Sequence, residues 1–233
     1  MTSQIDAPWG LYERLRPAQI EAIIATCPVA YVPWGALEFH GLHNPIGLDG
    51  LKAHGLCRAA AQRAGGVVLP PVYVATETIK VVRGFKHSVE HPAGTVRSLC
   101  ADYLEQLVDE GFRVVAVVSG HGSGSHVDAL RAAGAACMSA HPQVRVTTLT
   151  DPEIGHYGAD HAAIGETSLL MAVDPGLVDL GALPGDHVPT LDDDGVWGED
   201  PAASSAETGN AMLAAFVNGA ATHVRRLREE VNV

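Results

Sequence analysis

The sequence is poor in basic residues and contains no long apolar run. Its 233 residues include 15 Lys and Arg against 27 Asp and Glu, a formal net charge of −12. This negative surplus repels phosphate backbones and anionic lipid headgroups, so we expect neither nucleic acid nor a membrane surface as a partner. The longest strand-like apolar run covers residues 114–118, whereas a membrane-spanning helix needs roughly 18 such residues.

The sequence also has few cysteines and lacks the features of an export signal at residues 1–15. The four cysteines, Cys27, Cys57, Cys100 and Cys137, are widely spaced and form no CxxC pair. Buried free thiols explain this pattern better than disulfides or a zinc knuckle. Residues 1–15 lack the basic segment and apolar stretch of a secretory signal. These absences together lead us to expect a cytoplasmic protein.

What the chain does contain is typical of a globular protein. Hydrophobic residues make up 47% and charged residues 18%, with 25 Gly and 14 Pro, so a sizeable core is available. Because a domain usually holds about 100–200 residues, we expect residues 1–233 to form one domain. Short β-branched runs alternate with segments of helical periodicity. This alternation predicts an α/β fold, a single three-layer α/β/α domain with a mainly parallel central sheet.

The same alternation predicts where the elements lie. Strands are expected over 28–33, 67–74, 113–118 and 144–149, and helices over 51–64, 95–110, 127–140, 169–173 and 204–230. Consecutive apolar residues leave strand 113–118 no solvent face, so we place it at the centre of the sheet. Thr95 is expected to cap its helix and Gly111 to end it. Pro70 and Pro71 interrupt the second strand, and residues 186–200 are expected to form a surface loop.

The first of three polar stretches lies on a loop with Gly and Pro, after the first predicted strand. Within twelve residues it offers Glu38, His40, His43 and Asp49. Imidazole and carboxylate donors at this density suit Zn²⁺ or Mn²⁺. Any one of these residues could instead cap the helix that follows, and that alternative stays open.

The second polar stretch, residues 118–126, directly follows the central strand. Ligands in open α/β sheets gather beyond the carboxyl ends of the strands, so His121 points to the expected site. The glycines of this stretch fit neither the dinucleotide-binding GxGxxG pattern nor the P-loop with its Lys. A GxSxG nucleophile elbow is also absent.

The third polar stretch, residues 160–168, contains His161 and Glu166 just before an apolar helix. Glu166 could be a ligand or a capping-box glutamate, and His161 has the same two alternatives. His87 and His91 lie in the loop after the second strand, where they could line the same pocket or cap a helix.

Together these stretches resemble the motifs of the creatininase, or creatinine amidohydrolase, family. The family's Glu-x-His-Gly-x-His loop, with its following Pro and Asp, is matched by Glu38, His40, Gly41, His43, Pro45 and Asp49. Its Gly-His-Gly loop is matched at 120–122, and its His before a Glu-Thr-Ser helix start at His161 and 166–168. Residues 93–95 resemble its Pro-Gly-Thr turn, with Ala93 for Pro, and 175–180 its Pro-x-Leu-Val-Asp pattern. The resemblance covers about residues 29–180.

The resemblance implies a dinuclear metal centre in an α/β subunit that assembles as a homo-oligomer, often a hexamer. The implied ligands are Glu38, His40, Asp49, His121 and Glu166, with Asp49 as the bridge. Zn²⁺, Mn²⁺ and Fe²⁺ all accept this mixed nitrogen and oxygen set. The expected cofactors are therefore two divalent ions, Zn and/or Mn, with Fe as an alternative.

The resemblance also implies an amidohydrolase that cleaves a C–N bond of a small amide through a metal-bridging hydroxide. Glu38 and His161 are the expected catalytic residues. Imidazole titrates near pH 7, so His161 is the candidate acid that protonates the departing nitrogen. His43 could instead orient a carboxylate ligand.

The chain departs from the family where substrate would bind. Ser123 stands where creatininase carries an acidic residue, Tyr157 lies near His161 in place of tryptophans, and Phe39 replaces a common Gln. With His91, these are the expected substrate-binding residues, and their differences argue against creatinine as the substrate. We expect a cyclic amide, a lactam or a formamide. The alternatives are a peptide end, a different bond cleaved with the same metals, and a non-catalytic relative that binds a small molecule.

Overall fold

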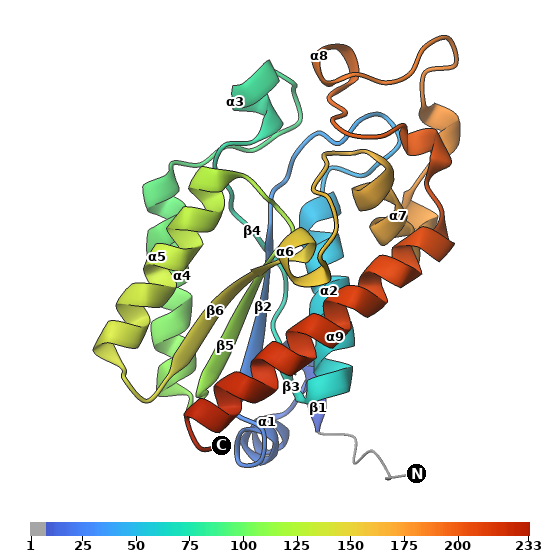
Figure 1. Ribbon diagram of the computed structural model, residues 1–233. Helices are drawn as coiled ribbons and strands as arrows, with labels where there is room; N and C mark the ends of the chain where they lie inside the picture. Colours follow the sequence, from blue (N-terminus) through green and yellow to red (C-terminus); the bar gives the residue numbers. More distant parts are fainter. Residues whose placement is uncertain (1–7) are drawn as a thin grey trace.

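The computed structural model describes residues 8–233 and contains a parallel sheet flanked by helices on both faces (Figure 1). The strands are β1 (Trp9–Leu11), β2 (Val29–Gly35), β3 (Gly66–Val68), β4 (Val72–Tyr73), β5 (Val114–Ser119) and β6 (Arg145–Thr150). Their order in the sheet is β1-β3-β2-β5-β6, and β4 pairs with the carboxyl end of β2. Every strand pair runs parallel. The predicted α/β fold with a mainly parallel sheet is confirmed.

The helices divide between the two faces of the sheet. They are α1 (Pro17–Ile24), α2 (Leu48–Ala64), α3 (Ile79–Arg83), α4 (Ala93–Asp109), α5 (Gly124–Ala140), α6 (Asp151–Gly155), α7 (Ile164–Val173), α8 (Leu191–Asp194) and α9 (Ala206–Glu230). Buried side chains of α1, α4 and α5 form one core cluster with the sheet, and those of α2, α7 and α9 form the other. None of the helices among the described residues is long and apolar enough to cross a lipid bilayer.

Strand β5 has no solvent-exposed face because helices cover both sides of the sheet. Val115 and Val117 point into the cluster formed with α4 and α5. Val114, Ala116 and Val118 alternate with them and point into the cluster formed with α2 and α9. Successive side chains of a strand point to opposite faces, so the apolar run fills both cores. β5 also lies between β2 and β6, as expected for the central strand.

Several element boundaries differ from the expected ones. The second predicted strand is two strands, β3 and β4, because Pro70 and Pro71 supply no N–H for a continuous ladder. Helix α4 begins at Ala93, so Thr95 lies in its first turn and is not the cap. Gly111 adopts a φ of +101° just after α4, as a helix stop requires.

Further differences concern short elements and the first residues of helices. Strand β1 and helix α1 were not predicted, and the expected loop 186–200 contains the single helical turn α8. Helix α2 begins at Leu48, so Asp49 lies in its first turn and not in the preceding loop. The final helix, α9, begins after Ser205, whose side chain caps it by accepting from Thr208 N. The expected single domain extends over residues 1–7, which lie outside the described residues.

The fold brings the carboxyl ends of β2 and β5 against the first turn of α2. Gly120 follows β5, and a Cβ atom there would lie 2.1 Å from the backbone oxygen of Asp49. Only a residue without a side chain permits this approach, which sets the distance between the second polar stretch and Asp49. Gly122, two residues further on, would meet nothing within 4 Å.

We therefore expect Gly120→Ala to destabilise the protein by about 1–3 kcal/mol, as overpacking of a close contact does. Gly122→Ala is the matched control, because its new methyl group has free space. Urea unfolding of both variants measures the difference. Equal stability of Gly120→Ala and wild type would contradict the close contact.

Candidate metal centre

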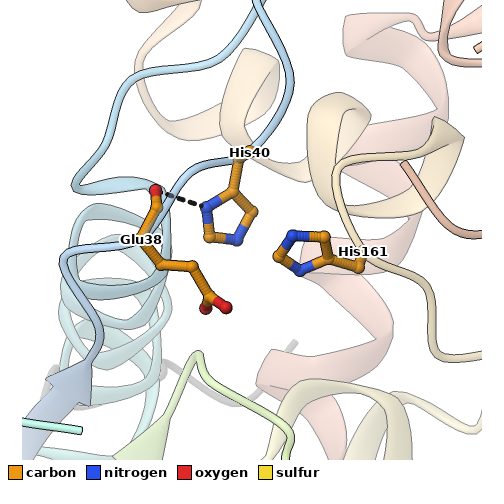
Figure 2. Close-up of side chains that lie close together, drawn as sticks. All are labelled: Glu38, His40 and His161. Atoms are coloured by element: carbon orange, nitrogen blue, oxygen red, sulfur yellow. Dashed lines mark hydrogen bonds between the residues drawn. The ribbon is translucent and has the colours of Figure 1, made fainter. Parts of the chain in front are cut away.

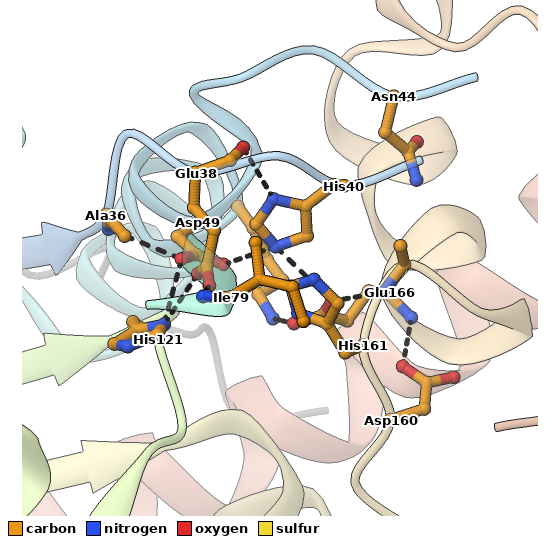
Figure 3. Close-up of polar contacts among 12 residues, drawn as sticks. Ala36, Glu38, His40, Asn44, Asp49, Ile79, His121, Asp160, His161 and Glu166 are labelled. Atoms are coloured by element: carbon orange, nitrogen blue, oxygen red, sulfur yellow. Dashed lines mark hydrogen bonds and ion pairs between the residues drawn. The ribbon is translucent and has the colours of Figure 1, made fainter. Parts of the chain in front are cut away.

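The five expected metal ligands converge at the carboxyl ends of the central strands (Figure 3). Glu38 and His40 follow β2, Asp49 lies in the first turn of α2, His121 follows β5, and Glu166 lies in the first turn of α7. All five side chains are buried. Residues that are up to 128 positions apart in the sequence thus share one site, as the strand-end rule predicts.

One group of ligand atoms comes from Glu38, Asp49 and His121. The His121 Nδ1 atom lies 3.0 Å from Glu38 Oε2 and 3.3 Å from Asp49 Oδ2. One ligand atom from each of the three residues lies within 4.8 Å of the others. This spacing can accommodate a single ion between one imidazole and two carboxylates.

A second group comes from His40, Asp49 and Glu166. The His40 Nε2 atom lies 3.2 Å from Asp49 Oδ1 and 3.6 Å from Glu166 Oε2. Asp49 thus belongs to both groups and presents a different oxygen to each histidine. This is the arrangement that a bridging carboxylate requires.

Hydrogen bonds orient both histidines for coordination. His121 Nε2 lies 3.1 Å from the Thr76 carbonyl, and His40 Nδ1 lies 3.0 Å from the Glu38 carbonyl. A carbonyl can only accept, so each of these nitrogens carries the proton. The other ring nitrogen then directs its lone pair at the carboxylates, as in metal-ligating histidines.

The residues present fit a divalent cation. Glu38 Oε2, His40 Nε2 and Asp49 Oδ1 are buried and form no hydrogen bond within the described part of the chain. Burial lowers the pKa of His40, but Asp49, Glu166 and Glu38 outweigh it and raise that pKa to about 9. His121 likewise has its pKa raised well above the usual value by Asp49 and Glu38 against the effect of burial. The buried carboxylates of Glu38, Asp49 and Glu166 therefore stabilise a positive charge beside them, which protonated histidines or a metal ion can supply.

Two buried residues that the sequence analysis missed support Glu166. Lys52 Nζ lies 2.7 Å from Glu166 Oε1 and 3.4 Å from Asp151 Oδ1. The other Glu166 oxygen, Oε2, accepts from Ala162 N at 2.8 Å and also faces His40. Glu166 therefore faces the site and does not form the expected capping box, because it accepts from Ala162 N and not from Ala163, the N-cap of α7.

A signal for these two residues does exist in the sequence. Lys52 follows Asp49 by three positions, which places both on one face of a helix. Asp151 directly follows β6, at the edge of the sheet where the other ligands lie. A lysine in a helix is usually solvent-exposed, so the pattern alone does not reveal its burial.

His161 lies beside His40, with ring centroids 4.3 Å apart and Glu38 close to both (Figure 2). Its Nε2 atom lies 3.1 Å from the Phe39 carbonyl. Burial lowers the pKa of His161, and the neighbouring His40 lowers it further. The imidazole is therefore neutral near pH 7.

A cavity of about 310 Å³ opens onto both groups of ligands. It is lined by Glu38, Asp49, Glu77, Ile79, Val82, His121, Gly122, Ser123, Ala159, Asp160, His161, Glu166, Leu191 and Trp197. The lining contains five carboxylates and no Lys or Arg. Its large apolar members come from α3, α8 and the loop between α8 and α9.

Of the four expected substrate-binding residues, the cavity lining includes Ser123 but not the other three. The Phe39 ring stacks on Phe85 at 4.8 Å. The Tyr157 hydroxyl donates to Asp151 Oδ2 at 3.3 Å, in a smaller adjoining pocket. His91 lies in the turn before α4, where its N–H donates to the Ala75 carbonyl. The Phe39 and Tyr157 side chains thus have partners outside the cavity lining.

His43 does not contact a carboxylate ligand, contrary to the role expected for it. Its Nε2 atom lies 2.9 Å from the Ala162 carbonyl and 3.1 Å from Thr167 Oγ1. His43 therefore ties the loop after β2 to the start of α7. His87 is exposed, and neither it nor His91 is part of the cavity lining.

The fold and the site together define an α/β subunit with an acidic, histidine-containing candidate metal site at the strand ends. A sequence profile described as creatinine amidohydrolase matches residues 13–224. The chain belongs to the creatininase family.

Relatives within this family differ in what they are named for. Creatinine amidohydrolase of Pseudomonas putida is 27% identical over 231 residues, covering 84% of this chain and 88% of that protein. The mycofactocin precursor peptide peptidase of Mycolicibacterium smegmatis is 27% identical over 228 residues, covering 88% and 87%. A solved structure described as creatininase Mn has a TM-score of 0.79 at 22% identity and covers 96% of this chain and 99% of its own. That structure supports the fold.

The raised pKa of His40 predicts how the metal-free protein responds to pH. A folded-state pKa of about 9 exceeds the unfolded value of about 6.5, so protonated His40 contributes stability below pH 6.5 that is lost as the pH rises through 9. We expect the free energy of unfolding, measured in urea with a chelator, to fall over this range. Added Mn²⁺ should stabilise the protein more at the alkaline end, because it competes with fewer protons.

Two variants test the origin of this pH dependence. His40→Gln should reduce it and leave the part that the raised pKa of His121 contributes, whereas His141→Gln, which removes a surface histidine bonded to Glu105, should leave it unchanged. A metal-free protein whose stability does not fall between these pH values would contradict the assignment.

Proposed function

We propose that this chain is a metal-dependent amidohydrolase that cleaves the C–N amide bond of a small substrate. The observation that carries the proposal is Asp49, whose two oxygens face the His121 and His40 groups separately at the wall of a cavity. Glu38 and His121 would hold one divalent ion with Asp49, and His40 and Glu166 the other. When bound, such a pair lowers the pKa of a water and polarises the carbonyl under attack.

The donor set suits Zn²⁺ or Mn²⁺, with Fe²⁺ as the alternative, because all three accept imidazole with carboxylate. A related creatininase structure is described as containing Mn. Lys52 binds Glu166 Oε1, so Oε2, which accepts from Ala162 N and faces His40, is the oxygen that Glu166 would present to the ion.

His161 is positioned to move the proton that amide hydrolysis requires. Its Nε2–H donates to the Phe39 carbonyl, so Nδ1 is the free acceptor of the neutral ring. Nδ1 can take the proton released by the attacking water and return it to the departing nitrogen. His161 would therefore act first as a base and then as an acid.

The cavity favours a small substrate without negative charge. A volume of about 310 Å³ is at the lower end of small-molecule sites. Ile79, Val82, Leu191 and Trp197 form its apolar wall, and Glu77 and Asp160, the two lining carboxylates that are not proposed as ligands, would disfavour an anion. We therefore retain a cyclic amide, a lactam or a formamide as the expected substrate. A peptide end is the second candidate, because one relative is named as a peptide peptidase.

The homo-oligomer, a hexamer by resemblance, and the cytoplasmic location remain expectations of the proposal. Neither affects the assignment of residues within the subunit.

The proposal is tested by metal analysis and activity together. We expect the purified protein to hold two divalent ions per chain and to hydrolyse small amides in a screen of lactams, formamides and short peptides. Chelation should abolish the activity, and Mn²⁺ or Zn²⁺ should restore it. Glu38→Gln should lose metal and activity, whereas Glu105→Gln, a surface control paired with His141, should lose neither. A protein that binds no ion and hydrolyses none of these substrates would overturn the proposal.

His161→Gln tests the proton-transfer role separately. We expect kcat to fall by about 10²–10⁴-fold, the usual contribution of general acid–base catalysis, with both ions retained. Steady-state kinetics and metal analysis of the same sample measure the two effects. Loss of an ion from His161→Gln would instead assign His161 to the ligand set.

A further inference from the structure

The turn at residues 76–78 is held by a single carboxylate, Glu90, at the segment before α4. Glu90 Oε1 accepts from Glu77 N at 2.6 Å and from Thr76 Oγ1 at 3.1 Å. Its Oε2 accepts from Thr78 N at 2.8 Å and from Thr78 Oγ1 at 2.7 Å. Four donors from three consecutive residues thus converge on one side chain, which anchors the turn.

The turn needs such an anchor because its backbone is strained. Glu77 adopts a φ of +62°, in the left-handed region that non-glycine residues avoid. A conformation of this kind persists only where the surrounding structure holds it. The hydrogen bond from Glu77 N to Glu90 acts directly on the strained residue. At the other side, Glu77 Oε2 accepts from Ser125 N at the start of α5.

The same turn contacts two of the candidate metal ligands. The Thr76 carbonyl accepts from His121 Nε2 at 3.1 Å and from Ser123 Oγ at 3.2 Å. Ile79 N donates to Glu38 Oε1. The bond to the Thr76 carbonyl fixes the protonated nitrogen of His121. The bond from Ile79 N occupies Glu38 Oε1 and leaves Glu38 Oε2 facing His121 Nδ1. Residues 76–79 therefore set the orientation of both ligands.

We propose that Glu90 is a positioning residue for the group formed by Glu38, Asp49 and His121. It acts through the turn at residues 76–78 and through Ile79, which follows the turn. The inference rests on the proposed function, because it assumes that this group binds a cation. Glu90 itself is not part of the cavity lining and does not contact a ligand. The second group lacks this support, since Lys52, Ala162 and Glu38 provide the contacts of Glu166 and His40. Loss of Glu90 should thus weaken one ion and largely spare the other.

The test is a Mn²⁺ titration of the metal-stripped full-length protein, followed by the EPR signal of the free ion. Wild type should bind two ions. In Glu90→Gln, which keeps the shape of the side chain but points an amide at four donors, one ion should bind about 10–100-fold more weakly, as is typical for loss of an outer-shell partner. The affinity for the other ion should change less than that for the first. The matched control is Glu153→Gln, a surface glutamate that bonds to Arg131 and Thr150 and does not contact the turn.

A second variant keeps the test valid if Glu90→Gln does not fold. Thr78→Val is isosteric and removes only one of the two Thr78 donors to Glu90, so it should weaken the same ion to a smaller extent. Circular dichroism and thermal unfolding establish that each variant is folded before the titration.

The outcomes separate this inference from the proposed function. Wild-type protein that binds no ion overturns both. Two ions in wild type with unchanged affinities in the folded Glu90 and Thr78 variants overturn the positioning role and leave the amidohydrolase proposal intact. Equal weakening of both ions would show a general loosening of the fold and would also contradict the role of Glu90. Selective weakening of one ion, absent from Glu153→Gln, supports it.

Discussion

The site depends on the close contact of the ends of β2 and β5 with the first turn of α2. A Cβ atom at Gly35 would lie 2.3 Å from Gly50 N, and one at Gly120 would lie 2.1 Å from the Asp49 carbonyl. With two glycines at these positions, the helix start packs directly on the strand ends. Asp49 is thereby buried between two histidines that come from different strands. The first turn of a helix also favours a negative charge, which suits a carboxylate at this position.

Charge balance explains why the surrounding residues are arranged as they are. Glu38, Asp49, Asp151 and Glu166 are all buried, and an unpaired buried carboxylate is costly. Lys52 compensates Asp151 and Glu166 through two ion pairs. No such lysine reaches Glu38 and Asp49 among the described ion pairs, so their compensation falls to His40, to His121 or to a cation. The ligand geometry and the charge balance therefore both indicate a cation beside Glu38 and Asp49.

The fold and the ligands were predictable from the sequence where the signal is local. Strand β5 is a run of apolar residues, and α9 is a long amphipathic helix with a serine cap, so periodicity finds both. The ligands follow strands, and parallel strands end at one edge of the sheet. The substrate-binding residues stay predictions: the Phe39 ring packs on Phe85 and the Tyr157 hydroxyl bonds to Asp151, and no local pattern in the sequence marks either contact. Lys52 and Glu90 were missed for the same reason, since nothing in their neighbours in the sequence marks a lysine as buried or a glutamate as an anchor.

The arrangement also bears on whether the centre serves catalysis or only stability. A structural metal site is closed by protein ligands, whereas a catalytic site keeps positions open to solvent or substrate. Here each group supplies three protein ligands, and Glu38, Asp49, His121 and Glu166 all form part of the cavity wall. Lys52 binds one oxygen of Glu166, so only the other, Oε2, faces His40 and the site. His161 completes the wall as a neutral imidazole beside the ligands. A centre that only stabilised the fold would require neither the open cavity nor the adjacent base, so the structure favours one that acts on a bound molecule.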